Sequence, residues 1–498
     1  MNILTLLIIV PLITIIGILL AKNQNQTRWV VAVGMGIQLL QSINLVFTFL
    51  AERKAGNNAE VLFSKSYVWY QSLNIQFSIG VDGIAVAMIL LTSMVIFAGI
   101  FASWEVRYLY KEFFISLILL TSGVFGFFIS LDLFVIFLFF ELAVIPMYLL
   151  IGIWGSGKKE YSAMKLTLML MGASAVLLVG IFAIYFNSNY QGQHTFNIIE
   201  IARSGLPVDV QLWAFPLVFI GFGVIGALFP FHTWSPDGHS SAPTAVSMLH
   251  AGVLMKLGGY GCLKVAIGLM PAGVNQWVTV FLVLTATGVI YGAIATIMQK
   301  DLKYINAYSS VSHCGLVLFA ILMLNKTAIN GAVLQMISHG LMTALFFALI
   351  GMLYGRTKTR IVDEMGGLMK VMPFLSVCYV IAGLASLGLP GLSGFVAEMT
   401  IFVGSFQHPD TFHRVITIIA VSSIVVTAVY ILRVIGTLLQ GPLKKEEYIE
   451  IKDASWYEKV ATVTLLIGII GIGLAPLWLS DMLYDSIQPI IDAIRIEM

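Results

Sequence analysis

Charged residues are scarce in this chain. Asp, Glu, Lys and Arg make up 10% of its 498 residues, and 59% of the residues are hydrophobic, whereas soluble proteins carry about 25% charged residues. This shortage excludes a soluble globular domain and indicates an integral membrane protein. The formal net charge of +2 provides no strongly basic surface, and we expect no nucleic-acid partner.

Cysteine and the common catalytic motifs are also rare or absent. Cys262, Cys314 and Cys378 lie in apolar stretches without a C-x-x-C pair, which argues against a disulfide framework and a cysteine zinc site. The sequence has no G-x-S-x-G motif, phosphate-binding loop or dinucleotide fingerprint. Residues 152–159 combine glycines with lysines but lack the phosphate-loop spacing. We therefore expect no cofactor-binding or metal-binding residues in this chain.

Long apolar stretches dominate what remains. Residues 2–20 lack the basic start and the Ala-x-Ala-like end of a cleaved signal peptide, so we expect a true membrane span there. A transmembrane helix needs about 20 mostly apolar residues. On this measure we predict an all-α polytopic membrane protein with about 14 transmembrane helices. The predicted spans cover residues 2–21, 29–51, 79–103, 112–130, 132–154, 162–186, 211–231, 242–269, 275–298, 304–324, 327–354, 372–404, 411–437 and 457–480.

The lysines and arginines between the spans are unevenly distributed. Loops that follow odd-numbered spans carry most of them, for example Lys158 with Lys159 and Lys444 with Lys445. Because basic loops stay on the cytoplasmic side of a membrane, both termini are expected on the outer side. The two longest connections, 52–78 and 187–210, are strand-like or polar and contain no motif.

The seventh and twelfth spans contain sequences that a continuous helix cannot accommodate. Pro230, Pro236 and Pro243 lie at the end of the seventh span, and each removes a backbone donor. The twelfth contains Gly-Leu-Pro-Gly-Leu-Ser-Gly at 388–394. Although glycine and proline are common in membrane helices, broken helices 7 and 12 favour two inverted five-helix repeats around an ion path. The predicted units are a three-helix segment at 1–110, helices 4–8 at 111–270, helices 9–13 at 271–440, and a C-terminal loop with helix 14 at 441–498.

Several carboxylates and lysines lie inside the predicted spans. A charge near the bilayer centre costs about 2.5–3.5 kcal/mol, so such residues usually have a function. Glu141 and Lys256 lie deep in apolar spans, and Glu398 directly follows the second break. A structural ion pair is the alternative for Glu141. Lys165 lies about one turn into its span, from which its side chain can also extend to the membrane surface.

Histidines form a second group of candidates. His313 and His339 lie on successive spans among small polar residues, a setting in which imidazole can transfer protons near neutral pH. A packing role is the alternative for each. His232 and Asp237 lie in the first break, where they either take part in the path or stabilise the loop. Together with Glu141, Lys165, Lys256 and Glu398, these residues are candidates for proton transfer.

Six motifs carry a resemblance to a known family. They are Phe-Glu-Leu-Ala-Val-Ile-Pro-Met-Tyr (140–148), Pro-Phe-His-Thr-Trp-Ser-Pro-Asp-Gly-His-Ser-Ser-Ala-Pro-Thr (230–244), Ala-Gly-Val-Leu-Met-Lys-Leu-Gly-Gly-Tyr-Gly (251–261), Ala-Tyr-Ser-Ser-Val-Ser-His-Cys-Gly (307–315), Met-Gly-Gly-Leu (365–368) and Leu-Gly-Leu-Pro-Gly-Leu-Ser-Gly-Phe-Val-Ala-Glu (387–398). With these motifs the chain resembles the M-type antiporter-like subunits of bacterial NADH:quinone oxidoreductase (respiratory complex I).

The resemblance implies proton pumping driven by quinone reduction elsewhere in the complex. NADH, FMN, iron–sulfur clusters and quinone would then bind other subunits. The partners would be the other membrane-arm subunits, especially the L-type and N-type antiporter-like subunits, and lipids of a bacterial inner (cytoplasmic) membrane, with both termini periplasmic. By position, the family's functional residues correspond to Glu141 in helix 5, Lys165 in helix 6, Lys256 in helix 8, His339 in helix 11 and Glu398 in helix 12.

One position departs from the family pattern. The family usually has a lysine five residues before Pro-Phe-His, as partner of the helix-5 glutamate, and this chain has Ile225 there. His250 stands instead where many M-type members are apolar. We therefore hypothesise that Glu141 pairs with Lys165, His250 or Lys256. The competing functions are a subunit of a multi-subunit cation/proton antiporter or membrane-bound hydrogenase, and a non-conducting scaffold.

Overall fold

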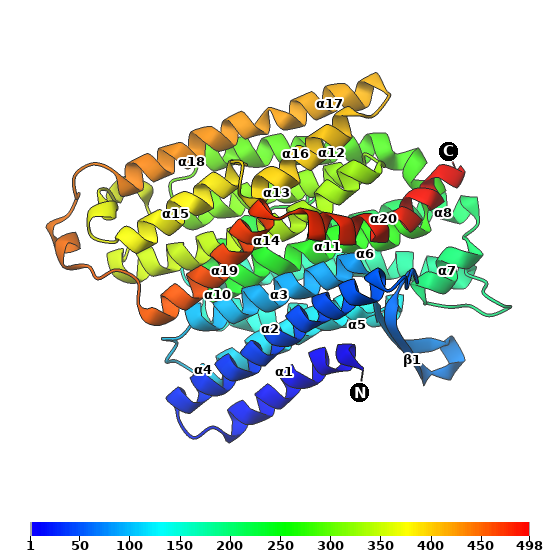
Figure 1. The fold of residues 1–498 in the computed structure, drawn as a ribbon, viewed down its shortest axis with the longest axis horizontal. Coiled ribbons are helices and arrows are strands. Elements are labelled where there is room, and N and C mark those ends of the chain that lie inside the picture. The colour runs from blue at the N-terminus through cyan, green and yellow to red at the C-terminus, as the bar shows by residue number, and fades with distance from the viewer. Residues whose placement is uncertain (1, 498) are drawn as a thin grey trace.

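The chain forms a bundle of long helices that run nearly parallel to one another (Figure 1). The computed structural model describes residues 2–497; the first and last residues, which the predicted terminal units include, lie outside this range. Within it, 12 helices are long and apolar enough to cross a membrane, which confirms the all-α membrane architecture. They are α1 (Ile3–Leu20), α2 (Gln24–Lys54), α3 (Gly83–Ala102), α4 (Tyr110–Ile129), α5 (Leu133–Trp154), α6 (Lys159–Asn187), α8 (Val208–Ile225), α12 (Pro271–Ile297), α13 (Leu302–Ile321), α14 (Lys326–Thr357), the pair α17 (Thr411–Val421) and α18 (Ser423–Leu439), and α19 (Trp456–Leu474).

The two ends of the bundle differ in what they carry. Both chain termini lie at one end, which we call the terminal end (Figure 1). The α5–α6, α14–α15 and α18–α19 connections lie at the opposite end. We call this the basic end, because these connections hold Lys158, Lys358 and Lys444. A chain with both termini at one end crosses the bundle an even number of times. The fourteen predicted spans agree with this.

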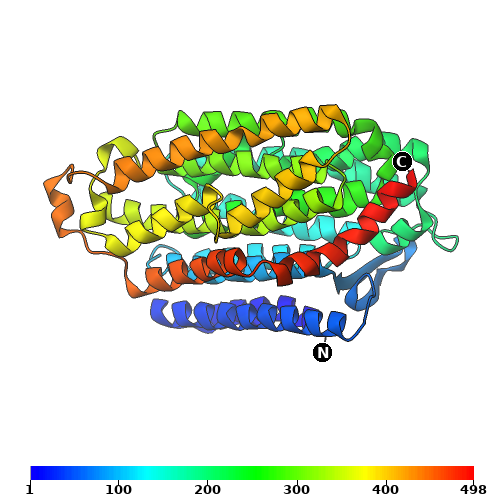
Figure 2. The same cartoon turned by 45° about the horizontal axis from the view of Figure 1, so that its top comes forward.

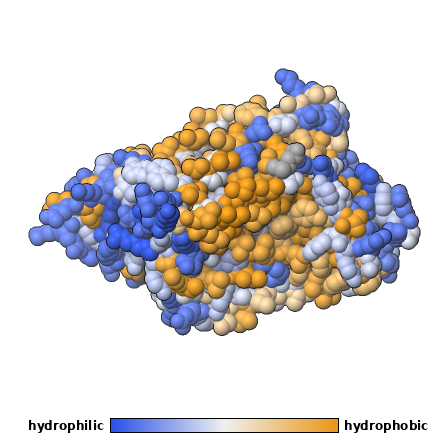
Figure 3. Space-filling model, turned by 90° about the horizontal axis from the view of Figure 1, so that it is seen from below, coloured by the Kyte–Doolittle hydropathy of each residue, from blue (hydrophilic) through white to orange (hydrophobic). Residues whose placement is uncertain are grey.

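Apolar side chains cover the middle of the bundle surface. Figure 3 shows an orange band between hydrophilic ends on the face seen from below. On α2, Leu40 and Phe47 are each 67% exposed. Helices α1 and α2 form an outer layer beside this face (Figure 2). Because exposed leucine and phenylalanine are unfavourable in water, this band is the surface that faces lipid.

Asp82 and Asp132 cap the starts of two transmembrane helices, α3 and α5. Asp82 Oδ1 accepts a hydrogen bond from the backbone of Ala85 at 2.8 Å, and Asp132 Oδ1 accepts from Phe134 at 2.9 Å. Such caps satisfy backbone donors that have no partner inside the helix. Asp82 also forms an ion pair with Lys264 at 2.6 Å, so its role is structural.

The break in the first broken helix begins earlier in the sequence than the positions of the prolines indicated. Helix α8 ends at Ile225, residues 226–233 are not α-helical, and α9 (Trp234–Ser241) follows. Pro236 lies in the first turn of α9, where a missing backbone donor costs nothing. The non-helical residues after α8 are therefore 226–233, instead of a single break over 230–243, and 242–243 form a second, shorter interruption after α9. A Cβ atom on Gly258 would collide with the backbone of Phe222 and Gly226, so the break packs directly on the next span.

The second break lies where the sequence placed it. Helix α15 (Pro373–Ser386) and helix α16 (Ser393–Phe406) are separated by 387–392. Gly388 and Gly391 have φ angles of +66° and +92°, which glycine adopts without steric cost. The two breaks thus fall five spans apart, and the inverted relation between the repeats stays a prediction.

The predicted helix at 242–269 is not a regular α-helix. It comprises α10 (Thr244–Leu249), a π-helical turn η2 (His250–Leu254), α11 (Met255–Gly261) and a second π-helical turn η3 (Cys262–Ile267). π-Turns are rare and occur mostly at functional sites. Here the first begins at His250 and ends two residues before Lys256.

The connections and the C-terminus contain elements beyond the predicted spans. Strands β1 (Leu62–Tyr70) and β2 (Ile75–Val81) form an antiparallel hairpin in the strand-like connection. The 187–210 connection holds a short helix, α7 (Ile198–Ser204). Helix α20 (Leu477–Glu497) follows α19 and was not predicted. Its Ser486 hydroxyl accepts a hydrogen bond from Gly83 N at 2.8 Å, which attaches α20 to the start of α3.

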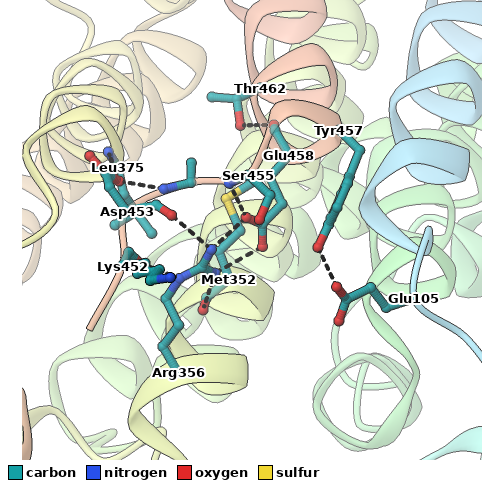
Figure 4. A network of polar contacts seen from close by, with 11 residues as sticks. Glu105, Met352, Arg356, Leu375, Lys452, Asp453, Ser455, Tyr457, Glu458 and Thr462 are labelled. Carbon is teal, nitrogen blue, oxygen red and sulfur yellow. Dashed lines mark hydrogen bonds and ion pairs between the residues drawn. The ribbon is translucent and has the colours of Figure 1, made fainter. Parts of the chain in front are cut away.

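A polar network joins three helices at the basic end (Figure 4). The Arg356 guanidinium of α14 donates to both carboxylate oxygens of Glu458 in α19, at 2.9 and 2.6 Å. It also donates to the carbonyls of Lys452 and Asp453. The Asp453 carboxylate in turn accepts from Phe374 N at 2.7 Å, at the start of α15. One arginine therefore holds α14, α15 and α19 together.

We expect Arg356→Met to destabilise the fold by about 2 kcal/mol, because it leaves the poorly exposed Glu458 carboxylate without its charged donors. The apparent melting temperature in detergent, compared with that of Lys54→Met at an exposed site, measures this effect. Arg356→Lys should lie between the two, since lysine keeps the charge but not the two-pronged geometry. An unchanged melting temperature for Arg356→Met would show that the network has no structural role.

Candidate functional site

An ion pair lies where the broken helix meets the basic end. Lys165, in the second turn of α6, contacts Asp237 of α9 at 2.7 Å. Tyr304 donates to the other Asp237 oxygen at 3.2 Å. The side chains of Lys165 and Asp237 are 23% and 25% exposed, so water reaches the pair. Lys165 thus extends to a carboxylate of α9, and not only towards the membrane surface.

Two cations hold the end of α9 in place. The Lys303 ammonium donates to the Ala242 carbonyl at 2.6 Å, and Arg360 donates to the Ser240 carbonyl at 2.8 Å. Asp301 pairs with Arg360 at 3.0 Å. Carbonyls at a helix C-terminus carry partial negative charge and attract cations. Lys303 is only 5% exposed, although it lies just outside the predicted span at 304–324.

Two buried histidines follow towards the centre of the bundle. The rings of His239 in α9 and His250 in η2 lie 4.1 Å apart, and the His250 ring stacks on Trp234 at 5.1 Å. Both histidines are 0% exposed. Neither ring nitrogen of His250, nor Nδ1 of His239, has a hydrogen-bond partner among the described residues. Unpaired polar atoms are costly inside a protein, and this pair is therefore a place for ordered water.

Lys256 occupies the middle of the bundle. Its side chain belongs to α11, and Nζ donates to His339 Nδ1 of α14 at 2.8 Å and to the carbonyl of Ala251. Lys256 and His339 are each 1% exposed. A cavity of about 10 Å³ beside Lys256 has a wall that includes Cys314, which is room for about one water molecule.

Further titratable side chains lie between His339 and the terminal end of the bundle. The rings of His339 and His313, on α14 and α13, lie 5.2 Å apart. His313 Nδ1 faces Glu398 Oε1 of α16 at 3.3 Å. The Gln335 amide donates to His313 Nδ1 at 3.1 Å and to Glu398 Oε1 at 3.5 Å. Another cavity of about 10 Å³ is bordered by His313, Ser386 and Glu398.

Comparison with known proteins places this geometry in a family. The family model described as "NADH:quinone oxidoreductase/Mrp antiporter, TM" matches residues 130–428, the part that holds all the titratable side chains from Lys165 to Glu398. The chain belongs to this family. It is 36% identical over 489 residues to "NAD(P)H-quinone oxidoreductase chain 4 1" of Synechococcus sp. (strain JA-2-3B'a(2-13)), an alignment that covers 97% of this chain and 91% of the relative.

Two solved structures share the fold of this NADH:quinone oxidoreductase/Mrp antiporter family member. A chain of "Respiratory complex I from Thermus thermophilus with bound NADH" superposes with a TM-score of 0.89 at 23% identity, and the match covers 99% of both chains. A chain of the "Mrp complex from Dietzia sp. DQ12-45-1b" gives a TM-score of 0.84 at 19% identity, again over 99% of both chains. At these identities the likeness concerns the fold alone.

The structure brings together most of the residues that the sequence singled out. Lys165 with Asp237, Lys256 with His339, and His313 with Glu398 form contacts between residues that are 72, 83 and 85 positions apart in the sequence. His250 lies between the first two pairs. We call the whole series, from Lys165 to Glu398, the buried axis. Its members are Lys165, Asp237, His239, His250, Lys256, His339, His313, Gln335 and Glu398.

Two candidates lie outside the buried axis. Glu141 makes no hydrogen bond or ion pair within residues 2–497, and its Oε1 is buried without a partner. The hypothesis that it pairs with Lys165, His250 or Lys256 is therefore wrong in this structure, because Lys165 pairs with Asp237 and Lys256 with His339. His232 stacks on Phe229 at 5.5 Å, which is a packing role in the first break.

Three polar residues in or beside the buried axis were not predicted from the sequence, each for a physical reason. His239 lies in the polar stretch after the first break, and nothing local distinguishes it from His232. Gln335 is uncharged, and only its position between His313 and Glu398 gives it importance. Lys303 is adjacent to loop lysines, and its burial results from α9 folding over it. A histidine four residues before a proline at the end of α9 was the one available signal.

Proposed function

We propose that this chain is a proton-translocating membrane-arm subunit of an NADH:quinone oxidoreductase. The observation that carries the proposal is the buried axis, which crosses the bundle from a water-accessible ion pair at the basic end to Glu398 in the half nearer the terminal end. Each charged group within it costs insertion energy, and a purely structural bundle has no use for so many. Similarity to a chain-4 subunit along nearly the whole length supports the parent complex.

The central step is a proton transfer between Lys256 and His339. The Lys256 ammonium already donates to His339 Nδ1 at 2.8 Å, a distance at which a proton can pass without side-chain movement. From His339, the proton reaches His313 and then Glu398. A change in the charge of a neighbouring subunit, driven by quinone reduction elsewhere in the complex, would alter the affinity of Lys256 for its proton and so drive the transfer.

The His239–His250 pair supplies Lys256 from the basic end. In this chain Ile225 replaces the family's usual helix-7 lysine, and it is buried with no titratable group. The histidine pair provides three unpartnered ring nitrogens within residues 2–497. Water bound to these nitrogens would carry protons from the Lys165–Asp237 pair to Lys256, with imidazole accepting and releasing the proton.

The side chains in the middle of the buried axis indicate which ion is transported. Lysine and histidine nitrogens dominate the stretch between His239 and His313, and hard metal cations require several oxygen ligands instead. An ammonium group also repels a cation. The buried axis is therefore suited to protons and not to sodium.

The proposal also assigns a membrane, an orientation and neighbouring subunits to the chain. The chain would lie in a bacterial cytoplasmic membrane with its basic end inside and both termini on the periplasmic side, in agreement with the positive-inside rule. L-type and N-type antiporter-like subunits would be its neighbours. NADH, FMN, iron–sulfur clusters and quinone would bind elsewhere in the complex.

Purification of the native complex through a tag on this chain tests the parent assembly. We expect subunits that oxidise NADH and contain iron–sulfur clusters and flavin to co-purify. A complex that lacks these subunits and exchanges cations for protons would assign the chain to an antiporter, whose fold it shares.

We expect His250→Phe to reduce proton pumping without lowering the stability of the protein. Phenylalanine fills the space beside Trp234 without an unpaired nitrogen, so the melting temperature should stay the same or rise. Proton pumping by the assembled complex should fall about tenfold or more, because a positioned acid–base group contributes about 10²–10⁴ to proton transfer. Acridine-dye quenching in proteoliposomes measures pumping. Full pumping by the variant would remove His250 from the path, whereas His194→Gln on the surface should change neither quantity.

A further inference from the structure

Two histidines and an aspartate meet at the corner between α16 and α17, outside the buried axis. The sequence there is His408-Pro409-Asp410-Thr-Phe-His413. One ligand atom from each of His408, Asp410 and His413 lies within 4.8 Å of the other two. The corner lies at the terminal end of the bundle, near the top right of Figure 1. Nothing in the proton path accounts for this cluster.

The Asp410 side chain faces one of the two histidines. Asp410 is the N-cap residue of α17. Its carboxylate accepts a hydrogen bond from His413 Nδ1 at 2.7 Å. The carboxylate is thus turned towards the histidines, where a ligand for a cation would be needed.

The surrounding contacts pre-form the cluster. The His408 and His413 rings stack at 3.7 Å. Asp410 N donates to His408 Nδ1 at 3.3 Å, which fixes the orientation of this ring. Arg414 Nε donates to the His408 carbonyl at 2.8 Å, and Pro409 restricts the backbone between the ligands.

The cluster is also open to solvent. The Asp410 side chain is 51% exposed, which leaves an open path from solvent and room for a water ligand.

We propose that His408, Asp410 and His413 bind a divalent transition-metal ion, with Zn²⁺ as the best fit. Two imidazoles and one carboxylate are typical ligands of a four-coordinate Zn²⁺ whose last position holds water. Tetrahedral geometry places ligand atoms about 3.3 Å apart, which small rotations of the stacked rings achieve from the observed spacing. Zn²⁺ would replace the proton that His413 shares with Asp410. Nitrogen ligands disfavour Ca²⁺ and Mg²⁺.

Zinc binding to the full-length chain in detergent, purified through a tag without histidines, tests the site. Zn²⁺ is titrated against a fluorescent chelator for the wild type, for the double variant His408→Gln/His413→Gln and for the surface control His194→Gln. We expect one saturable Zn²⁺ per chain in the wild type and the control, and an affinity at least about tenfold lower in the double variant. Excess Mg²⁺ should not compete, and the affinity should fall as the pH falls, since protons compete for the ligands.

Melting temperature gives an independent measure. Zn²⁺ should raise it for the wild type and the control, because a ligand that binds only the folded state stabilises that state, and should leave the double variant unchanged. Without metal, all three proteins should melt at similar temperatures, since the cluster lies at a surface corner. Equal zinc affinity in the wild type and the double variant, or no saturable binding by the wild type, would overturn the proposal.

Discussion

Lys256→Met should reduce proton pumping by the assembled complex to less than about a tenth of the wild-type rate, because it removes the central acid–base group of the buried axis. Methionine matches the length and apolar character of the lysine stem, so the surrounding packing persists. The fold should tolerate the change or gain stability, since a buried ammonium group is costly. NADH-driven dye quenching in proteoliposomes, together with the rate of NADH oxidation, measures the effect.

Two further variants separate charge from proton transfer at this position. Lys256→Arg keeps a positive charge but does not release its proton in proteins, so we expect it to fail as Lys256→Met does. Lys54→Met, at an exposed position, should pump normally. Full pumping by Lys256→Arg would show that a fixed charge suffices there, which contradicts a transfer from Lys256 to His339.

Glu398→Gln should have an effect of similar size at the other end of the axis. Glutamine keeps the shape of the side chain and its contact with Gln335 but neither accepts nor releases a proton. We expect pumping to fall at least about tenfold, while the complex assembles and retains its bound cofactors. Proton uptake and release, followed separately with pH dyes inside and outside the vesicles, measure the effect.

Glu398→Asp provides the matched control. Aspartate preserves the titratable group and shortens its reach, so partial pumping is expected, with water in the adjoining cavity replacing the direct contact to His313. If Glu398→Gln and Glu398→Asp both pumped at the wild-type rate, protons would leave the bundle by a route that bypasses α16.

Much of the fold could be predicted from the sequence because the bilayer restricts the choice. Apolar runs of about 20 residues correspond closely to α3, α5 and α14, since a spanning segment must satisfy its backbone within a helix. Helix α20 was missed because its apolar residues alternate with Asp481, Asp485 and Ser486. It attaches to the bundle through one face, and no long apolar run marks such a helix.

The irregular backbone was harder to predict than the spans. Prolines indicated that helix 7 breaks but misplaced the break, because Pro236 is accommodated in the first turn of α9. The two π-turns around Lys256 have no sequence signal of their own. The first of them packs closely on α14, where a Cβ atom on Gly252 would lie 3.1 Å from the Gly340 carbonyl.

For the site too, single residues could be recognised from their local sequence, whereas their contacts could not. Lys256, His339 and Glu398 were recognisable because a polar group in an apolar span is conspicuous. Their partners were not, since the contact of Lys256 with His339 joins positions 83 residues apart. For the same reason the expected pairing of Glu141 with Lys165 was wrong, since Lys165 pairs with Asp237 instead.

Ordered water in a structure of the assembled complex tests the central claim, a continuous proton path, most directly. We predict water molecules bound to both ring nitrogens of His250 and to Nδ1 of His239, continuing to the Lys256 ammonium, and further water between His313 and Glu398. A dry, apolar environment around the His239 and His250 nitrogens, at a resolution that shows water elsewhere in the complex, would contradict the account.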